Sequence, residues 1–321
     1  MIIITGAAGF IGSNFISKLN SEGINDIAIV DDFSSAIKNR NIAHKSFREK
    51  IDRDKFFEWF DKNHLQVAFV VHIGARTDTA ESDRSVFDRL NLGYSRQVWN
   101  CCVKYDVPLI YASSAATYGL GEYGFSDDHK IIEKLKPLNL YGESKNDFDK
   151  WVLGQKTSPP YWAGLKFFNV YGPNEYHKGR MASVIFHAYN QVIKTGKIRL
   201  FRSHNIDYND GEQKRDFIYV KDILDVIYFL MNHGKNPGIY NLGTGKARTF
   251  LDLAGNIFKV TGRKMNIEFI DTPEDIRDKY QYFTQAEMDK LTTTGYSKGF
   301  TSIESGIKEY VDDYLADMKY N

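Results

Sequence analysis

The stretch that decides the fold is "IIITGAAGFIGSNFISKLNSEG", residues 2–23, in which an apolar run leads into a glycine-rich turn and an amphipathic pattern. Gly6, Gly9 and Gly12 recur at every third position. Glycines keep such a turn tight and let backbone N–H groups approach a pyrophosphate at a helix N-terminus. The stretch therefore predicts a strand, a turn and a helix that bind a dinucleotide. A glycine-rich turn without a ligand would look the same locally.

A second apolar run, "DIAIVDD" at residues 26–32, ends in Asp31 and Asp32. An acidic residue at the end of the second strand can bind the adenosine ribose of a dinucleotide. Solvated residues at a strand end are the alternative. The order of strand, turn, helix and acidic strand end favours the dinucleotide site.

The alternation continues with predicted strands in "VAFVVHIGA", residues 67–75, and "VPLIYASSAATYG", residues 107–119, on either side of a helical stretch at 86–105. Such alternation predicts an α/β fold, a doubly wound parallel sheet of the Rossmann type with helices on both faces. Ligands of this fold bind at the carboxyl ends of the strands. We interpret His72, at one such end, as a packed histidine.

The chain shows no linker, repeat or low-complexity tract that would separate independent domains. We expect residues 1–168 to form mainly the dinucleotide-binding domain. Residues 169–321 would form mainly a smaller, interwoven α/β substrate-binding lobe, with a segment at about 214–243 returning to the first domain.

Bulk properties exclude several classes of protein. The 42 Lys and Arg against 41 Asp and Glu leave a net charge of +1, without the imbalance of a nucleic-acid or membrane-surface binder. No apolar run approaches the roughly 18 residues of a membrane span, and only Met1 precedes the first strand, so we expect no signal peptide. The adjacent Cys101 and Cys102 suit reduced thiols, and the histidines show no metal-ligand spacing. We expect a cytoplasmic protein without a metal.

The candidate reacting groups are Ser114, at the end of a predicted strand, and Tyr141 and Lys145 in "LYGESK". Spacing of four residues places Tyr141 and Lys145 on one helical face. A phenol has a pKa near 10, and a neighbouring ammonium lowers it toward the range of a useful base. Alone, this spacing is typical of an ordinary amphipathic helix, but here it follows a complete dinucleotide-binding unit.

Together with the glycine turn, "YASSAATYG", "YGESK", "FFNVYGPNE" and "RDFIYVKD" resemble the nucleotide-sugar branch of the extended short-chain dehydrogenase/reductases. "HKGRMASVIFH", residues 177–187, is similar to the ADP-L-glycero-D-manno-heptose 6-epimerases within that branch. The resemblance implies an isomerase that converts ADP-D-glycero-D-manno-heptose to its L-glycero epimer for lipopolysaccharide core synthesis. The route would be oxidation at C6 to a 6-keto intermediate, followed by return of the hydride from bound NADP.

Inversion at one carbon requires a second proton-transfer group, and Lys178 is the candidate for it. The hydride comes from one fixed face, so the ketone must turn, and its oxygen then needs a proton-transfer group at a second place. The resemblance implies that Tyr141 and Lys178 divide this work. We expect burial or the charge of Lys145 to depress the pKa of Lys178. A loop lysine that contacts phosphate or solvent is the alternative.

The resemblance also implies binding residues. Those expected at the cofactor are Gly6, Gly9, Phe10, Ile11, Gly12, Asp31, Asp32, Lys38, Arg53, Ile73, Gly74, Ala75, Arg76, Thr77, Asn91, Lys145, Val170 and Lys178. Those expected at the substrate are Asn169, Arg180, His187, Phe201, Arg202, Ser203, His204, Arg215 and Tyr280. Arg215 is expected to grip the diphosphate, with a salt bridge to Asp216 or Asp222 as the alternative.

The nature of the cofactor is ambiguous from charge alone. Asp31 and Asp32 would repel a 2′-phosphate and favour NAD. The family nevertheless uses NADP, and Lys38 and Arg53 stand where basic residues surround that phosphate, so we expect NADP. Arg53 replaces a lysine and Arg180 a small polar residue of the family pattern.

Competing functions remain open. A 4,6-dehydratase would carry an Asp-Glu pair where this chain has Ala115 and Ala116. A UDP-hexose 4-epimerase needs only the tyrosine and a rotating ketone. A dinucleotide-binding regulator without turnover would not need Ser114, Tyr141 and Lys145 together. The resemblance further implies a homo-oligomer, a pentamer in the family.

Overall fold

The apolar run near the N-terminus forms β1, an interior strand of a seven-stranded parallel sheet. The structure is a computed structural model, and it describes residues 1–277 and 280–321. The sheet order is β10-β6-β5-β4-β1-β2-β3. Its strands are β1 (Ile2–Thr5), β2 (Ile27–Asp31), β3 (Glu49–Asp52), β4 (Phe69–His72), β5 (Leu109–Ser114), β6 (Trp162–Phe167) and β10 (Gly238–Leu242). The predicted Rossmann-type fold is confirmed.

Both faces of this sheet are buried, because alternate residues of each strand enter different apolar clusters. In β1, Ile2 and Ile4 pack into one cluster, and Ile3 packs into the other. The first cluster includes α1 (Phe10–Ser21) and α9 (Val220–His233), which lie against each other. The second includes the helices of the opposite face, α3 (Phe56–Asn63), α5 (Tyr94–Lys104) and α7 (Leu140–Leu153).

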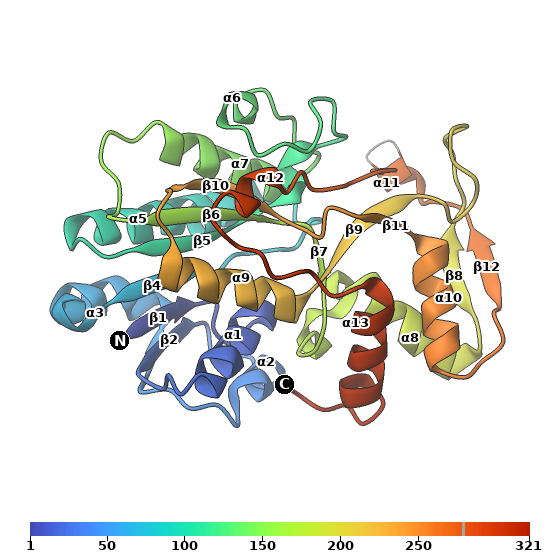
Figure 1. The fold of residues 1–321 in the computed structure, drawn as a ribbon, viewed down its shortest axis with the longest axis horizontal. Coiled ribbons are helices and arrows are strands. Elements are labelled where there is room, and N and C mark those ends of the chain that lie inside the picture. Colours follow the sequence, from blue (N-terminus) through green and yellow to red (C-terminus); the bar gives the residue numbers. More distant parts are fainter. Residues whose placement is uncertain (278–279) are drawn as a thin grey trace.

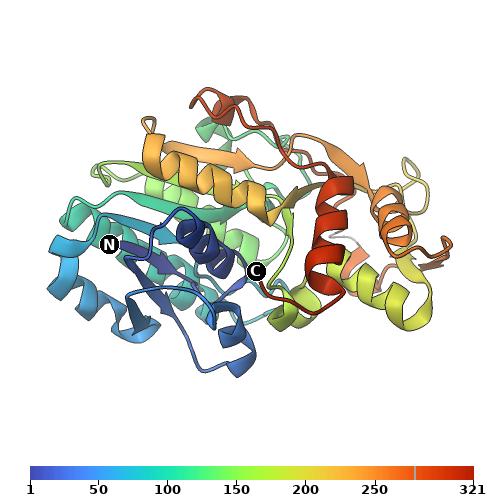
Figure 2. The same ribbon diagram turned by 60° about the horizontal axis from the view of Figure 1, so that its bottom comes forward.

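The second lobe is built from two small sheets and further helices, which gather at the right of Figures 1 and 2. One sheet has the order β11-β9-β7, with β7 (Asn169–Tyr171), β9 (Lys214–Tyr219) and β11 (Ala247–Thr249). The other pairs β8 (Ile198–Phe201) with β12 (Ile267–Ile270). The principal helices are α8 (Val184–Thr195), α10 (Phe250–Val260) and α13 (Ile303–Glu309).

Shorter segments connect these elements. The short α-helices are α2 (Ala36–Asn39), α4 (Arg84–Phe87), α6 (His129–Ile132), α11 (Glu274–Arg277) and α12 (Asp289–Thr292). The 3-10 turns are η1 (Arg40–Ile42), η2 (Arg53–Lys55), η3 (His64–Gln66), η5 (Ala115–Tyr118) and η6 (Tyr176–Met181). Segments of π-helix are η4 (Asp88–Gly93) and η7 (Tyr310–Leu315). No helix within the described ranges is both long and apolar enough to cross a bilayer.

The segment at about 214–243, which we expect to return to the first domain, contains strands of two different sheets. Its first strand, β9, pairs with β7 and β11 in the small sheet, whereas β10 joins the large sheet beside β6. Between them, α9 packs on α1. We retain the interwoven lobes and the boundary near residue 168 as a proposal.

The strand order changes direction at β1, whose neighbours are β2 and β4, and this point decides where a ligand can bind. Here the backbone turns come unusually close. A Cβ on Gly6 would lie 2.6 Å from Cα of Gly74, and Gly6 also has a positive φ of 68°. A Cβ on Gly12 would lie 2.3 Å from the carbonyl oxygen of Gly6. Only glycines allow this packing of turn, helix and neighbouring loop.

The stretch expected to be one helix at 86–105 is instead interrupted by the π-helical segment η4. The interruption places Asn91 where its side chain bonds both backbone groups of Arg76, at 2.8 and 3.0 Å, and the hydroxyl of Ser144 at 2.9 Å. Insertions of this type often occur at functional sites. The periodicity of the sequence could not reveal it, because a single added residue leaves the apolar pattern recognisable.

We predict opposite effects for two helical glycines. Gly12→Ala drives a methyl group into the backbone of Gly6 and should lower the free energy of unfolding by about 1–3 kcal/mol. Gly255→Ala in α10, where a Cβ meets no atom within 4 Å, should raise it by about 0.5–1 kcal/mol. Urea unfolding of both variants measures the difference, and equal effects would contradict the packing described.

Candidate active site

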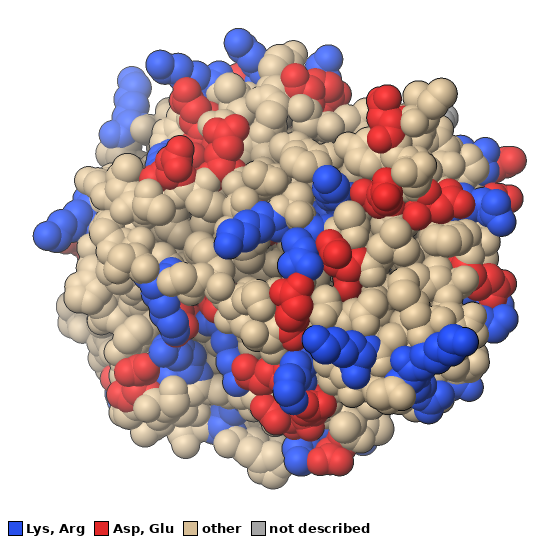
Figure 3. Space-filling view, turned by 45° about the vertical axis from the view of Figure 1, so that its right-hand side comes forward, with Lys and Arg blue, Asp and Glu red and all other residues tan. Residues whose placement is uncertain are grey.

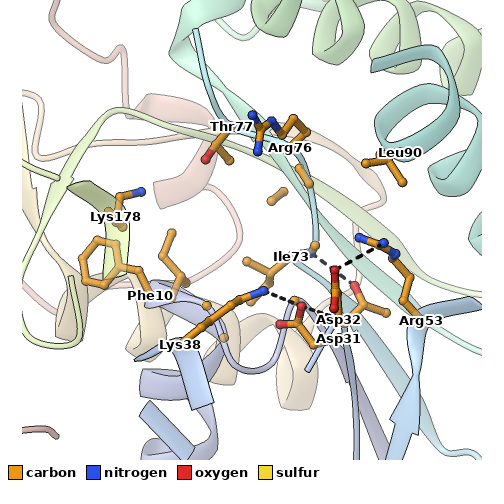
Figure 4. A pocket seen from close by; sticks show the side chains of 18 of the residues that line it. Phe10, Asp31, Asp32, Lys38, Arg53, Ile73, Arg76, Thr77, Leu90 and Lys178 are labelled. Atoms are coloured by element: carbon orange, nitrogen blue, oxygen red, sulfur yellow. Dashed lines mark hydrogen bonds and ion pairs between the residues drawn. The ribbon is translucent and has the colours of Figure 1, made fainter. Parts of the chain in front are cut away.

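A cavity of about 550 Å³ opens at the carboxyl ends of β1 and β4, the switch point of the large sheet. Its walls come from the loops after β1, β2, β4 and β5, from α7, and from η6 of the second lobe. In Figure 4, Lys178 and Phe10 lie together at one end, while Asp31, Asp32 and Arg53 lie at the other. The cavity therefore joins residues that are far apart in the sequence.

The structure places most of the predicted cofactor residues on this cavity. They are Gly6, Gly9, Phe10, Ile11, Gly12, Asp31, Asp32, Lys38, Arg53, Ile73, Gly74, Ala75, Arg76, Thr77, Lys145 and Lys178, joined by the predicted catalytic Tyr141. Ser114, Asn91 and Val170 are not among its lining residues, and neither are the predicted substrate residues. Ser113 lines the cavity next to Ser114.

The glycine turns form a cradle that a dinucleotide fits. The backbones of Gly6 and Gly74 pack directly against each other, with no room for a Cβ at Gly6, and both glycines line the cavity. The loop after β4 is held in place by Asn91 through the backbone of Arg76. Asn91 thus lies behind the loop and does not line the cavity. It would act on a cofactor only by holding the loop in place.

Two basic side chains lie close to the acidic end of β2. Asp31 accepts a 2.9 Å hydrogen bond from the backbone N–H of Ala8 and a 2.5 Å bond from Nζ of Lys38. Nη2 of Arg53 lies 3.7 Å from the carboxylate of Asp32. One carboxylate therefore fixes the glycine turn, and each of the two is paired with a basic side chain on the cavity (Figure 4).

Tyr141 and Lys145 follow the N-cap of α7, where the side chain of Asn139 accepts from the N–H of Gly142. Burial raises the pKa of Tyr141, and a hydrogen bond with Ser114 acts against this rise. Burial also lowers the pKa of Lys145 to about 8, and its amine donates a 2.8 Å bond to the carbonyl of Ala112. The expectation that the ammonium would lower the pKa of this phenol is not met in this arrangement, because burial of the phenol dominates.

Lys178 lies in η6, and a buried carboxylate fixes the loop around it. Glu175 accepts hydrogen bonds from the N–H of Gly172 at 3.1 Å, from the N–H of Ser183 at 2.5 Å and from the Ser183 hydroxyl at 2.8 Å. The hydroxyl of Tyr176 donates to the C-terminal segment, to the carbonyl of Lys319 at 2.9 Å. The loop that carries the second candidate base is thus tied on both sides.

The side chain of Lys178 is half-buried and its amine lies 5.7 Å from the centre of the Phe10 ring. Burial lowers the pKa of Lys178, and the nearby Glu175 opposes this shift. The expected depression is present, and its cause is burial. Lys178 and Tyr141 line the same cavity from different elements, so two groups able to transfer protons face one space.

The predicted diphosphate ligand Arg215 is buried in the second lobe. Its guanidinium donates to the carbonyl of Lys214 at 2.9 Å and to that of Gln281, and it lies between the rings of Phe250 and Tyr280, 5.7 and 5.4 Å from their centres. Burial lowers its pKa. The guanidinium is thus held by neutral groups.

The alternative salt bridges of Arg215 are not formed. The carboxylate of Asp216 accepts from Thr244, at 2.8 and 2.7 Å, and that of Asp222 accepts from Thr301, at 2.8 Å to each oxygen. Within the described part of the chain, Arg215 has no carboxylate partner. A buried cation held only by neutral groups is suited to an anionic ligand.

The other predicted substrate residues lie near this arginine or near η6. The ring of Phe201 packs 6.0 Å from that of Tyr280, and Ser203 and His204 follow it. Arg202 lies 3.7 Å from Asp271. Nε2 of His187 lies 3.3 Å from the carbonyl oxygen of Arg180. Asn169 is exposed at the start of β7, and Val170 follows it.

Arg180, which departs from the family pattern, forms an ion pair with Asp78 at 2.8 Å. Asp78 lies on the loop after β4 and also approaches Arg76 at 3.5 Å. The pair connects the cofactor loop to η6 across the rim of the cavity. In this structure the guanidinium of Arg180 is therefore paired with a carboxylate.

His72 is a packed histidine. Its Nδ1 lies 2.6 Å from the hydroxyl of Thr5 and its Nε2 lies 2.9 Å from that of Ser95. Burial lowers its pKa to about 3, with the charge of Lys145 acting in the same direction. Among the residues the structure describes, no group of three His, Cys, Asp or Glu side chains is placed to hold a metal.

Sequence reasoning missed several residues of the site. His177, Tyr94 and Met181 line the cavity, and Glu175 holds the loop of Lys178. Glu175 gave no signal, since one acidic residue after "GPN" is indistinguishable from a surface carboxylate. His177 stood beside Lys178 in the quoted motif, and that adjacency was the available signal.

Comparison with known proteins adds to this geometry. The profile of the NAD dependent epimerase/dehydratase family matches residues 2–243. Proteins named ADP-L-glycero-D-manno-heptose-6-epimerase from Fusobacterium nucleatum and Nitratidesulfovibrio vulgaris are 47% and 48% identical, and each match covers 98% of both chains. The chain belongs to the ADP-L-glycero-D-manno-heptose-6-epimerase group of the NAD dependent epimerase/dehydratase family.

The fold agrees with this membership. The crystal structure of Helicobacter pylori ADP-L-glycero-D-manno-heptose-6-epimerase matches with a TM-score of 0.80 and 26% identity, over 97% of this chain and 95% of that chain. The resemblance stated from the sequence is confirmed. For a member of this family, a nicotinamide dinucleotide is the cofactor that the glycine cradle accepts.

We predict that His72 makes this family member sensitive to acid. Its pKa is near 3 when folded and near 6.5 when unfolded, so the unfolded chain takes up a proton first as pH falls. Stability should be unaffected above about pH 6.5 and should fall by roughly 2 kcal/mol between about pH 7 and pH 5 through this group. In urea unfolding, the free energy of unfolding of His72→Gln should fall less steeply between about pH 7 and pH 5 than that of the wild type. The variant His64→Gln should show the same pH dependence of stability as the wild type.

Proposed function

We propose that this protein epimerises C6 of ADP-D-glycero-D-manno-heptose to give ADP-L-glycero-D-manno-heptose, for synthesis of the lipopolysaccharide core. The relatives named for this activity match over nearly the whole chain. The observation that carries the proposal is that Tyr141 and Lys178 line one cavity from different elements. A reaction that protonates and deprotonates an oxygen at two places has a use for both.

The cavity residues around Gly6, Gly9 and Gly74 would hold a nicotinamide dinucleotide, which would supply the hydride chemistry in both directions. The protein supplies the proton transfers. One of the pair Tyr141 and Lys178 removes the C6 hydroxyl proton as the carbinol is oxidised, and the other protonates the oxygen when the turned ketone is reduced. Ser114 acts to lower the pKa of Tyr141 and would orient its phenol. The lowered pKa of Lys178 suits this role, because its amine must be able to lose a proton near neutral pH.

Arg215 would bind the diphosphate of the substrate. Its guanidinium is buried among neutral groups and aromatic rings, which supports an anionic ligand there. Phe201, Arg202, Ser203, His204 and Tyr280 would complete this end of the site, and Asn169 and His187 would contact the sugar. The Arg180–Asp78 pair would have to open for Arg180 to contact the substrate.

The cofactor we propose is NADP. Lys38 and Arg53 line the ribose end of the cavity, and each already faces a carboxylate there, so both could pair with a 2′-phosphate instead. Asp31 also accepts from Ala8 and from the N–H of Asp32, which leaves it less free to bind two ribose hydroxyls. An NAD enzyme would need that carboxylate unengaged.

We predict that Lys178→Met abolishes net epimerisation but leaves partial oxidation or reduction of one epimer, because Tyr141 still serves one orientation of the ketone. An NMR time course with ADP-D-glycero-D-manno-heptose measures the first effect, and the nicotinamide absorbance measures the second. The kcat for net epimerisation should fall by about 10²-fold or more.

Lys194→Met is the matched control, since Lys194 is an exposed lysine on α8. It should turn over the substrate at the wild-type rate. Normal epimerisation by Lys178→Met would refute the assignment. Parallel incubation of the wild type with UDP-glucose tests the alternative of a UDP-hexose 4-epimerase, and no turnover of either sugar would support the non-catalytic regulator.

We predict that replacing Lys38 and Arg53 by alanine weakens NADP binding by roughly tenfold for each residue, with little change for NAD, because each charge-assisted bond to the phosphate contributes about 1.5 kcal/mol or more. Calorimetric titration with both dinucleotides gives the two affinities. The nucleotide released by denaturing the purified protein identifies the resident cofactor. Release of NAD alone would reject the NADP assignment.

The remaining predictions stay proposals. A homo-oligomer, pentameric as the resemblance implies, is tested by light scattering of the purified protein. Basic and acidic side chains are interspersed over the face in Figure 3, in keeping with the expected absence of nucleic-acid binding. The cytoplasmic location rests on the two free thiols, Cys101 and Cys102.

A further inference from the structure

Behind the reacting groups lies a fully buried ion pair that the reaction scheme above does not use. Nζ of Lys166, on β6, lies 2.7 Å from Oδ2 of Asp149, on α7, and both side chains have no exposed surface. Burial of two charges is costly unless their other hydrogen-bonding positions are also filled. Here they are filled by polar residues of β5 and η5.

One branch of this network leads to the strand end that carries Ser114. The hydroxyl of Ser113 donates to Oδ2 of Asp149 at 2.7 Å. The amine of Lys166 donates to Oγ1 of Thr117 at 2.7 Å, and that hydroxyl donates to the carbonyl of Ser114 at 2.8 Å. The backbone at Ser114 is therefore held from both sides by the buried pair.

The other branch leads to the face of α7 that carries the reacting groups. Asp149 follows Lys145 by four residues and Tyr141 by eight, so the three occupy one side of the helix. The charge of Asp149 acts to raise the pKa of Lys145 and that of Tyr141. The second oxygen of Asp149 accepts a 3.1 Å bond from the hydroxyl of Tyr111, which fixes the carboxylate.

We propose that the buried Asp149–Lys166 pair is a positioning unit for the epimerase reaction, which holds the Ser114 backbone through Thr117 and places a carboxylate one helical turn from Lys145. Asp149 and Lys166 do not touch the cavity and act only through the residues they hold. The proposal rests on the function proposed above, since it assigns the pair to that reaction centre.

A merely structural pair would not need this arrangement. Replacement of a buried ion pair by apolar residues is often neutral or stabilising, so stability alone is a weak reason for placing charges here. A carboxylate one turn from Lys145 has a specific electrostatic effect. Lys145 loses much of its solvation through burial, and an anion nearby offsets part of that loss.

The test compares the titration of the Lys145 amine in the wild type and in Asp149→Asn, which keeps the shape of the side chain and removes its charge. The amine signal is followed by NMR in isotopically labelled protein and assigned with Lys145→Met. In Asp149→Asn the midpoint should move to lower pH, because the ammonium has lost its stabilising anion. The alkaline limb of kcat should move in the same direction, with kcat at pH 8 lower by about tenfold and KM little changed.

Two further variants separate positioning from folding. Asp149→Asn combined with Lys166→Met removes both charges, so it should regain thermal stability lost in the single variant. Its midpoint should lie between those of the wild type and the single variant, because the cation of Lys166 is lost as well. Asp222→Asn removes a buried carboxylate of α9 bonded to Thr301, and should lower stability without moving the midpoint. An unchanged Lys145 midpoint in Asp149→Asn would overturn the proposal.

The titration of the Lys145 amine does not require turnover, so its outcome does not depend on the substrate. If the wild type fails to epimerise ADP-D-glycero-D-manno-heptose, the proposed function fails. The shift in the Lys145 midpoint would then still assign Asp149 to the electrostatics of α7, and an unchanged midpoint would reject only the role of the Asp149–Lys166 pair.

Discussion

The close approach of the Gly6 and Gly74 backbones is the constraint on which the site depends. It brings the turn after β1 against the loop after β4, and the carbonyl of Gly6 against Gly12 in α1. With side chains at these positions, the helix N-terminus and the two loops could not meet at the switch point of the sheet. The cavity and the residues around it follow from this contact, because the loops after β2 and β5 open onto the same edge.

A second level of organisation lies behind the residues that face the cavity. Asn91 bonds the backbone of Arg76, Glu175 bonds the loop of Lys178, and the Asp149–Lys166 pair links α7 and β6 to the end of β5. Each is buried and fully engaged with polar partners. Such residues keep the reacting groups in place without contacting the ligand, which matters because small displacements at a reaction centre are costly.

The burial that organises the site also sets its chemistry. The pKa of Lys145 falls to about 8 and that of Lys178 is lowered, while that of Tyr141 is raised. Burial thus brings the pKa of Lys145 near neutral pH and moves that of Lys178 in the same direction. The i,i+4 spacing of Tyr141 and Lys145 suggested a lysine that lowers the pKa of the phenol, but spacing says nothing about how much solvent a helix face loses on folding.

The sequence by itself determined the Rossmann-type sheet, the glycine turn, the acidic end of β2 and the family, because these depend on local periodicity and on short motifs. Three features were decided only by the tertiary structure: the placement of Tyr141 and Lys178 on one cavity, the separation of the Arg215 cation from Asp216 and Asp222, and the π-helical turn at Asn91. These features rest on contacts between segments far apart in the chain and on burial. Neither leaves a regular pattern along a sequence, since partners that meet in space obey no fixed spacing.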